Sequence, residues 1–167
     1  GNNLETIFSV LRRANSIMKI SVIYEWATIG CYPEPHAVNK YVKTENTAET
    51  SRAIIDALRQ DQAEFIFSDF DAPDAAGHRS GGSSEDYKIA VENIDHAIGS
   101  IVATVKELNL SDRTYFILLS DHGHLAVGGD HSPAEMPVPF IIAGPGIKPG
   151  EITHPMANNQ LAQVVAL

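Results

Sequence analysis

The sequence contains Tyr115-Phe116-Ile117-Leu118-Leu119-Ser120-Asp121-His122-Gly123, an apolar run that ends in a carboxylate beside an imidazole. A short run of apolar residues is typical of a strand that is covered on both faces. Asp and His side chains are costly to remove from water unless they are paired or bind a cation. The stretch therefore predicts a buried strand that delivers two polar groups to one place, with a metal ion as their simplest partner.

Outward from this stretch, strand-like and helix-like patterns alternate along the chain. Period-2 and β-branched runs predict strands over residues 17–26, 64–70, 114–120 and 139–143. Apolar residues at helical spacing predict helices over residues 3–14, 47–60 and 84–108, and residues 27–46 are expected to form a long loop. This alternation predicts an α/β fold with a mostly parallel sheet flanked by helices.

Two helix starts have clear capping signals. Asn46-Thr47-Ala48-Glu49 fits a capping box, and either Ser83 or Ser84 can cap the helix that follows. That helix is the longest we expect, because apolar residues recur every three or four positions over six turns. Its predicted buried stripe consists of Tyr87, Val91, Ile94, Ile98, Ile101, Val105 and Leu108.

Composition narrows the class of protein. The 167 residues suffice for one domain, which we expect to span 1–167. The formal net charge of −9 argues against binding to nucleic acid, which needs clustered Lys and Arg. The single cysteine, Cys31, excludes an internal disulfide, and no apolar stretch reaches the ~18–20 residues of a membrane span. The start at Gly1 and the helical pattern running to Leu167 suggest that both ends are cut.

Three groups of Asp and His follow predicted strands. Asp74 and His78 are four residues apart, so one turn of backbone can aim both at a single ion. Asp121 and His122 are adjacent, and they can serve one ion because the strand ends there at Gly123. His131 lies in a glycine-rich turn. Carboxylate and imidazole ligands suit Zn²⁺, with Mn²⁺ and Fe²⁺ as alternatives.

Taken one at a time, these residues could equally be helix caps, turn residues or surface histidines. His36, His96 and His154 lack carboxylate neighbours in such a context, and we interpret them as surface or loop residues. His124 lies two residues beyond His122 and can face the same cleft, although the sequence offers little support for a direct ligand role. The recurrence of the pattern after three strands favours a metallohydrolase.

The combined motifs resemble those of the alkaline phosphatase superfamily, most closely its type I phosphodiesterases and nucleotide pyrophosphatases. The resemblance covers the chain from about residue 4 to its end. It rests on Asp74-x-x-Gly77-His78, Ser120-Asp121-His122-Gly123, Gly129-x-His131 and Pro139-Phe140-Ile141-Ile142-Ala143-Gly144-Pro145-Gly146. Ser132 departs from the family pattern, which more often has glycine after the last histidine.

The resemblance implies a centre of two divalent metal ions, most simply Zn²⁺. Asp74, His78 and His131 would hold one ion, and Asp121 and His122 the other. The family also uses an early Asp and a Thr or Ser nucleophile, and neither group is found here. We therefore expect a partial domain whose nucleophile lies upstream of residue 1, and negligible hydrolysis by this chain alone. Two cations ~4 Å apart would lower the pKa of such a nucleophile and neutralise the transferring phosphoryl group.

The expected substrate is a small phosphate ester or nucleotide. Two alternatives stay open: a sulfatase or phosphomutase of the same superfamily, and a non-catalytic metal-binding scaffold domain. The deciding nucleophile is not in the sequence, so the residues alone do not choose among them. Oligomeric state and compartment are also open, although relatives of this kind are often exported.

Overall fold

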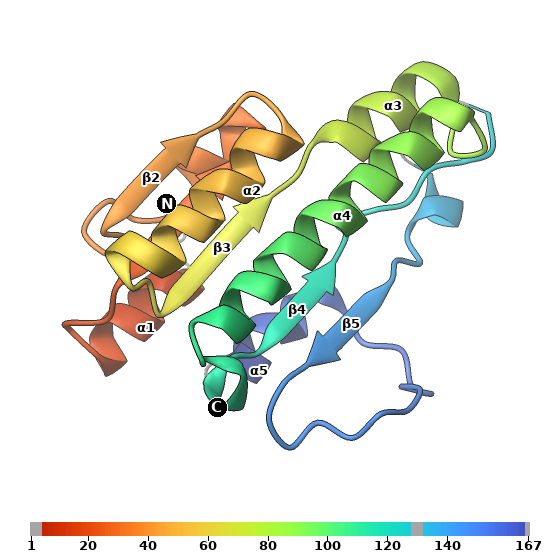
Figure 1. Ribbon diagram of the computed structural model, residues 1–167. Coiled ribbons are helices and arrows are strands. Elements are labelled where there is room, and N and C mark those ends of the chain that lie inside the picture. The colour runs from red at the N-terminus through yellow and green to blue at the C-terminus, as the bar shows by residue number, and fades with distance from the viewer. Residues whose placement is uncertain (1–4, 128–131, 166–167) are drawn as a thin grey trace. The chain divides into compact units, whose positions relative to one another are not determined.

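In the computed structural model, which describes residues 5–127 and 132–165, the described strands form two sheets (Figure 1). The chain divides into two compact units, one of residues 1–70 and 152–167 and the other of residues 71–151. Each is an assembly of helices and strands, so the predicted α/β class is confirmed. None of the described helices combines the length and the apolar character that crossing a membrane requires.

The first unit contains a parallel three-stranded sheet with the order β2-β1-β3. In its central strand, Val22 is paired with Tyr41 on one side and with Phe67 on the other. Its strands are β1 (Ile20–Tyr24), β2 (Lys40–Lys43) and β3 (Phe65–Asp69). Its α-helices are α1 (Ile7–Ala14), α2 (Thr47–Asp56) and α5 (Leu161–Val165). Its shorter helical turns are Ala27–Cys31, Ala57–Asp61 and Asn158–Gln160.

The core of this unit lies around the central strand. Ile20 and Val22 of β1 are fully buried, and Phe8 and Leu11 of α1 belong to the same buried cluster. The Phe8 ring meets the rings of two residues of β3 edge to face, at centroid distances of 5.9 and 5.8 Å. Burial of β1 on both faces is what its near-continuous apolar sequence predicts.

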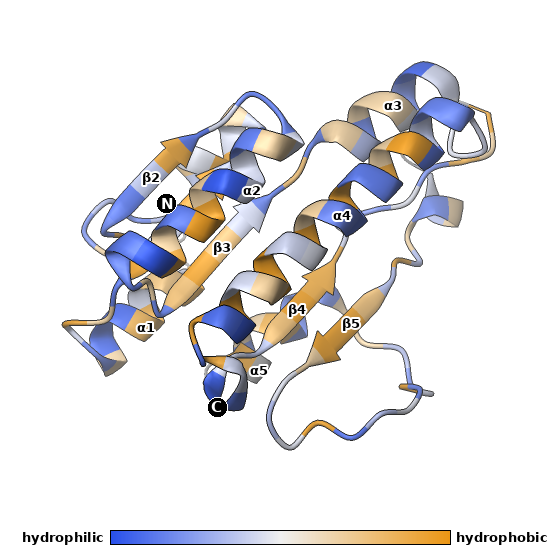
Figure 2. Ribbon diagram, in the orientation of Figure 1, coloured by the Kyte–Doolittle hydropathy of each residue, from blue (hydrophilic) through white to orange (hydrophobic). Residues whose placement is uncertain are grey.

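The second unit contains two helices and an antiparallel pair of strands. Helices α3 (Ala72–Ser80) and α4 (Glu85–Glu107) pack against each other. Strands β4 (Phe116–Leu119) and β5 (Phe140–Ala143) pair antiparallel, and Figure 2 shows both as hydrophobic along their length. The two remaining turns of 3₁₀-helix are Ser111–Arg113 and Pro133–Glu135.

Both predicted helix caps are confirmed. The Asn46 side-chain oxygen accepts a hydrogen bond from Glu49 N at 3.0 Å, and the Ser84 hydroxyl accepts one from Tyr87 N at 3.1 Å. Each cap satisfies a backbone donor that has no partner within its own helix.

One local prediction is wrong, and another fails at a single residue. The segment predicted as a loop over 27–46 contains β2, a short edge strand whose lysines point to solvent, so it lacks the apolar signal of a buried strand. The predicted stripe of α4 is mostly confirmed, since Ile101 and Val105 are buried and the only exposed member is Val91, at 45%. The buried face also includes Ala90, Ala97 and Thr104, whose small side chains allow close packing.

The Glu34 carboxylate gives the stability of the first unit a testable dependence on pH. Both the backbone N–H and the hydroxyl of Thr6, which precedes α1, donate hydrogen bonds to the Glu34 carboxylate. Removal from water raises the Glu34 pKa, but the Thr6 hydrogen bonds outweigh this effect and lower the pKa from 4.5 to about 2. The ionised form therefore stabilises the folded state.

Glu34→Gln is expected to lower the free energy of unfolding by about 1–2 kcal/mol near neutral pH, since a hydrogen-bonded charge is lost. Because the folded pKa is depressed, this contribution is complete above about pH 4.5 and disappears as the pH falls towards 2. Urea unfolding of both proteins over this range measures the difference. A difference that stayed constant on acidification would contradict the assignment.

Candidate metal centre

Helix α3 places Asp74 and His78 on one face. The helix begins with Ala72 and Pro73, and proline is well suited to the first turn because it has no N–H to leave unpaired. Asp74 lies in that first turn, where a carboxylate interacts favourably with the helix dipole. The spacing of four residues brings His78 Nε2 to 3.2 Å from Asp74 Oδ1.

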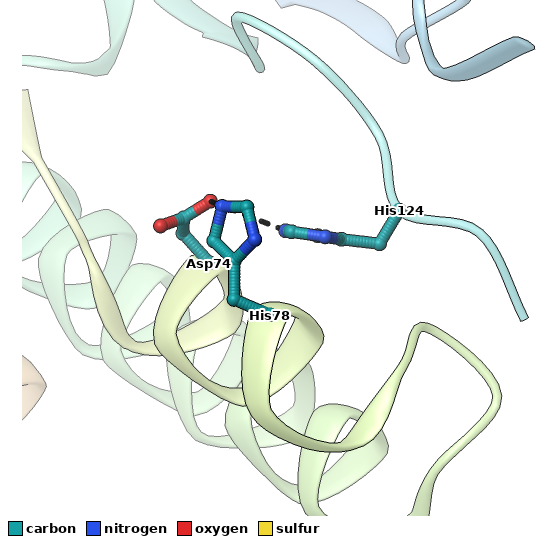
Figure 3. A group of neighbouring side chains, drawn as sticks. All are labelled: Asp74, His78 and His124. Atoms are coloured by element: carbon teal, nitrogen blue, oxygen red, sulfur yellow. Dashed lines mark ion pairs between the residues drawn. The ribbon is translucent and has the colours of Figure 1, made fainter. Parts of the chain in front are cut away.

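Two further imidazoles approach the same carboxylate oxygen from the segment that follows β4. His122 Nε2 lies 3.4 Å and His124 Nε2 3.2 Å from Asp74 Oδ1. Alternate residues of an extended segment point the same way, which explains why His122 and His124 act together. Figure 3 shows His124 facing Asp74 and His78 across the gap between this segment and α3.

The central oxygen has the character expected of a metal ligand. Asp74 Oδ1 is buried and makes no hydrogen bond in the described part of the chain, although a buried carboxylate oxygen ordinarily has several. An ion with tetrahedral ligands at about 2.0–2.2 Å holds neighbouring ligand atoms about 3.4 Å apart. The observed distances of 3.2–3.4 Å match this spacing. The donor set therefore fits a divalent cation.

The hydrogen bonding of His122 supports the same conclusion. Its Nδ1 lies 2.9 Å from the carbonyl oxygen of Gly123, which can only accept, so Nδ1 carries a proton. Nε2 is then the nitrogen that faces Asp74 and can offer its lone pair to an ion. A ring nitrogen held by a carbonyl in this way is the usual arrangement for a metal-binding histidine.

A simpler interpretation is a carboxylate paired with protonated histidines. This pairing explains why one imidazole lies beside the carboxylate, but it does not explain why three do. Three imidazolium groups around one oxygen would repel one another, with ring centroids of His78, His122 and His124 only 4.9–6.1 Å apart. A single cation would replace three ring protons and remove this repulsion.

His124 is the candidate ligand that the sequence interpretation undervalued. Its side chain is only 5% exposed, and its ring packs edge to face on Tyr87 of α4 at 5.6 Å. Asp74, His78 and His124 form the group whose ligand atoms all lie within 4.8 Å of one another. The signal available in the sequence was the alternation His122-x-His124 after a strand, which places both rings on one side.

The other two predicted ligands are placed differently. The Asp121 side chain is 83% exposed, with Oδ2 3.8 Å from His122 Nε2 and Oδ1 accepting a hydrogen bond from His122 N. It is thus a neighbour of the cluster rather than part of its centre. His131, the remaining predicted ligand, lies outside the described residues.

Comparison with known proteins agrees with this chemistry. The family model of the Metalloenzyme superfamily matches residues 23–167 of the chain. Curated relatives include phosphodiesterases, a phosphomutase and sulfatases. The chain is 32% identical over 120 residues to the 2,3-bisphosphoglycerate-independent phosphoglycerate mutase of Clostridioides difficile, covering 67% of this chain and 22% of the mutase. It is 29% identical to ectonucleotide pyrophosphatase/phosphodiesterase family member 3 of Mus musculus, covering 62% of this chain and 14% of that protein.

A solved structure shares the fold. Murine ectonucleotide pyrophosphatase/phosphodiesterase 5, an inactive form in complex with AMP, superposes with a TM-score of 0.53 at 23% identity. The match covers 70% of this chain and 31% of the murine one. The chain thus spans a third or less of the length of these relatives. Its family match, its fold and its carboxylate–imidazole cluster lead to one conclusion: the chain belongs to the Metalloenzyme superfamily, the alkaline-phosphatase-like proteins.

Proposed function

We propose that this chain contributes a divalent metal centre to a hydrolase of phosphate esters, of the phosphodiesterase and nucleotide pyrophosphatase type. The observation that carries the proposal is Asp74 Oδ1, buried without a hydrogen bond and surrounded by three imidazole nitrogens at 3.2–3.4 Å. Residues 1–167 then form part of one α/β metallohydrolase domain. A bound divalent cation, in the first instance Zn²⁺, would supply positive charge to a phosphoryl group.

In this proposal Asp74 and His78 hold the first ion. The geometry supports His124 as their third partner, whereas the family resemblance assigns that position to His131. His122 and Asp121 are proposed for the second ion. His122 also borders the first site, at 3.4 Å from Asp74 Oδ1, so it is well placed to lie between the two.

The proposed substrate is a small phosphate ester or nucleotide. Support comes from the relatives, since the murine structural neighbour was solved with AMP and the related curated enzymes are named for nucleotide phosphodiester cleavage. The acidic chain carries a net charge of −9, so an anionic substrate needs cations at the site to offset that charge.

Metal titration of single histidine variants tests the centre. His78→Ala is expected to weaken Zn²⁺ binding at least about 100-fold, more than the loss of an outer partner would. His124→Ala should have a comparable effect if this residue is a ligand, while His131→Ala should have it if the family assignment holds. Exposed His154→Ala is the control and should bind as the wild type does. Unchanged binding by His78→Ala would refute the proposed centre.

Activity of the full-length protein then separates the proposed reaction from its alternatives. Cleavage of bis-p-nitrophenyl phosphate in preference to p-nitrophenyl phosphate supports a phosphodiesterase. A preference for p-nitrophenyl sulfate favours the sulfatase alternative, which the sulfatases among the relatives also support. Tight metal binding without turnover of any of these esters favours a metal-binding scaffold.

A further inference from the structure

Glu135 is a buried carboxylate outside the cluster of ligands, at the end of the 3₁₀ turn Pro133–Glu135. It is 4% exposed, which is rare for a glutamate unless its oxygens are paired. Its Oε1 accepts a hydrogen bond from Leu125 N at 3.1 Å, and its Oε2 accepts one from Ser132 N at 2.6 Å. The side chain thus joins two separate stretches of backbone.

The same residue also holds the segment through its backbone. Gly123 N donates to the Glu135 carbonyl oxygen at 2.7 Å. Gly123 and Leu125 are the two neighbours of His124, so both sides of this histidine are hydrogen-bonded to one residue. These hydrogen bonds hold the backbone of His124 in place, so its ring stays directed towards Asp74.

The other edge of the segment is bonded to the turn between α3 and α4. Gly82 N donates to Leu125 O at 2.7 Å, and Ser83 N donates to Ala126 O at 3.3 Å. A Cβ at Gly82 would come within 2.8 Å of His124 O, so the two backbones are in close contact. The segment around His124 is therefore hydrogen-bonded to Glu135 on one side and, on the other, to the turn that follows α3, the helix that carries Asp74 and His78.

The negative charge of Glu135 is consistent with a role in holding the backbone around His124. Removal from water raises the Glu135 pKa, but hydrogen bonds from Ser132 and Leu125, with a contribution from nearby His124, outweigh it and lower the pKa. Glu135 is then ionised at neutral pH, and hydrogen bonds to an ionised acceptor are stronger than neutral ones. Each oxygen of the carboxylate accepts from one of the two backbone donors, whereas a glutamine at this position has only one oxygen to offer.

We propose that Glu135 is a positioning residue of the metal centre, which holds the Gly123–Leu125 backbone so that His124 faces Asp74. The inference rests on the proposed function. Glu135 acts through hydrogen bonds to backbone and binds no ion itself. Outer partners that orient a metal ligand typically contribute 10–100-fold to metal affinity.

The test is isothermal titration of Zn²⁺ and Mn²⁺ into wild type, Glu135→Gln and Glu135→Asp. In Glu135→Gln the side-chain amide nitrogen faces a backbone donor, so one hydrogen bond is lost. We expect about 10- to 100-fold weaker binding. Glu135→Asp keeps the charge but shortens the side chain, and it should recover part of the affinity. Glu151→Gln, which removes an exposed charge from the same unit, is the matched control and should bind normally.

His78→Ala in the same series keeps the two hypotheses apart. If His78→Ala loses the metal while both Glu135 variants bind as tightly as wild type, Glu135 has no positioning role and the centre stands. If His78→Ala binds normally, the centre itself is refuted. Proton NMR of the histidine rings adds a readout that a purely structural role would not change. In folded Glu135→Gln, the His124 resonance should differ from wild type before metal is added and should shift less on titration.

One measurement needs no variant at all. In metal-free wild-type protein the amide hydrogens of Gly123 and Leu125 should exchange slowly, because their acceptors are already in place. Exchange at the rate of an unprotected amide, with protection appearing only when Zn²⁺ is added, would overturn the inference even if every Glu135 variant failed to fold.

Discussion

Asp74→Asn is expected to abolish divalent-metal binding, with an affinity at least about 100-fold below that of wild type. Three imidazole nitrogens lie 3.2–3.4 Å from one oxygen of this residue, so it is the common element of the whole cluster. Asparagine has almost the same shape as aspartate but no negative charge, and it can direct an N–H towards the ion. The change therefore removes the electrostatic basis of the site with little change in volume.

Titration of Zn²⁺ and Mn²⁺ measures this effect directly, with circular dichroism to show that the helices remain. Asp95→Asn is a suitable control because it makes the same chemical change on an exposed face of α4 in the same unit. The metal-free Asp74→Asn protein should be less stable than wild type by only about 0.3–1 kcal/mol, since it loses the interaction of a charge with the helix dipole while Asp74 Oδ1 makes no hydrogen bond in the described structure. Equal affinity of Asp74→Asn and wild type would show that the cluster is a set of ordinary polar contacts.

Gly77→Ala is expected to damage the centre without touching a ligand. A Cβ at Gly77 would lie 2.4 Å from two ring carbons of His124, far inside van der Waals contact. Alanine is the better helix former by about 0.5–1 kcal/mol, but inserting a methyl group into close packing costs about 1–3 kcal/mol. The steric term is larger, so the variant should be less stable, and its His124 ring should be displaced from Asp74.

Metal titration and thermal unfolding of Gly77→Ala report these two effects together. Gly99→Ala provides the control, because it is the same substitution inside α4 with nothing within 4 Å of the new methyl group. That variant should be slightly more stable than wild type and should bind metal normally. If Gly77→Ala resembled Gly99→Ala in both measurements, the contact between α3 and His124 would not exist in solution.

Much of the fold could be predicted because its signals are local. The caps at Asn46 and Ser84 depend on residues three positions apart, and both were identified from sequence. The strand that precedes Asp121 was evident from its continuous apolar run. Edge strand β2 was missed since its exposed lysines carry no such signal, and the antiparallel pairing of β4 with β5 depends on how the chain returns.

The candidate centre shows the same division. Helical periodicity alone places Asp74 and His78 on one face, and the end of a strand alone predicts polar groups at Asp121 and His122. Local patterns in the sequence therefore predict the class of fold and the residue types of the candidate site. That His124 lies 3.2 Å from Asp74 was decided only by the packing of the segment after β4 against α3 and α4. The burial of Glu135 beneath that segment was decided in the same way. No helical or strand periodicity encodes these contacts, because Glu135 meets Leu125 ten positions away and His124 meets Asp74 fifty positions away, and only tertiary packing brings them together.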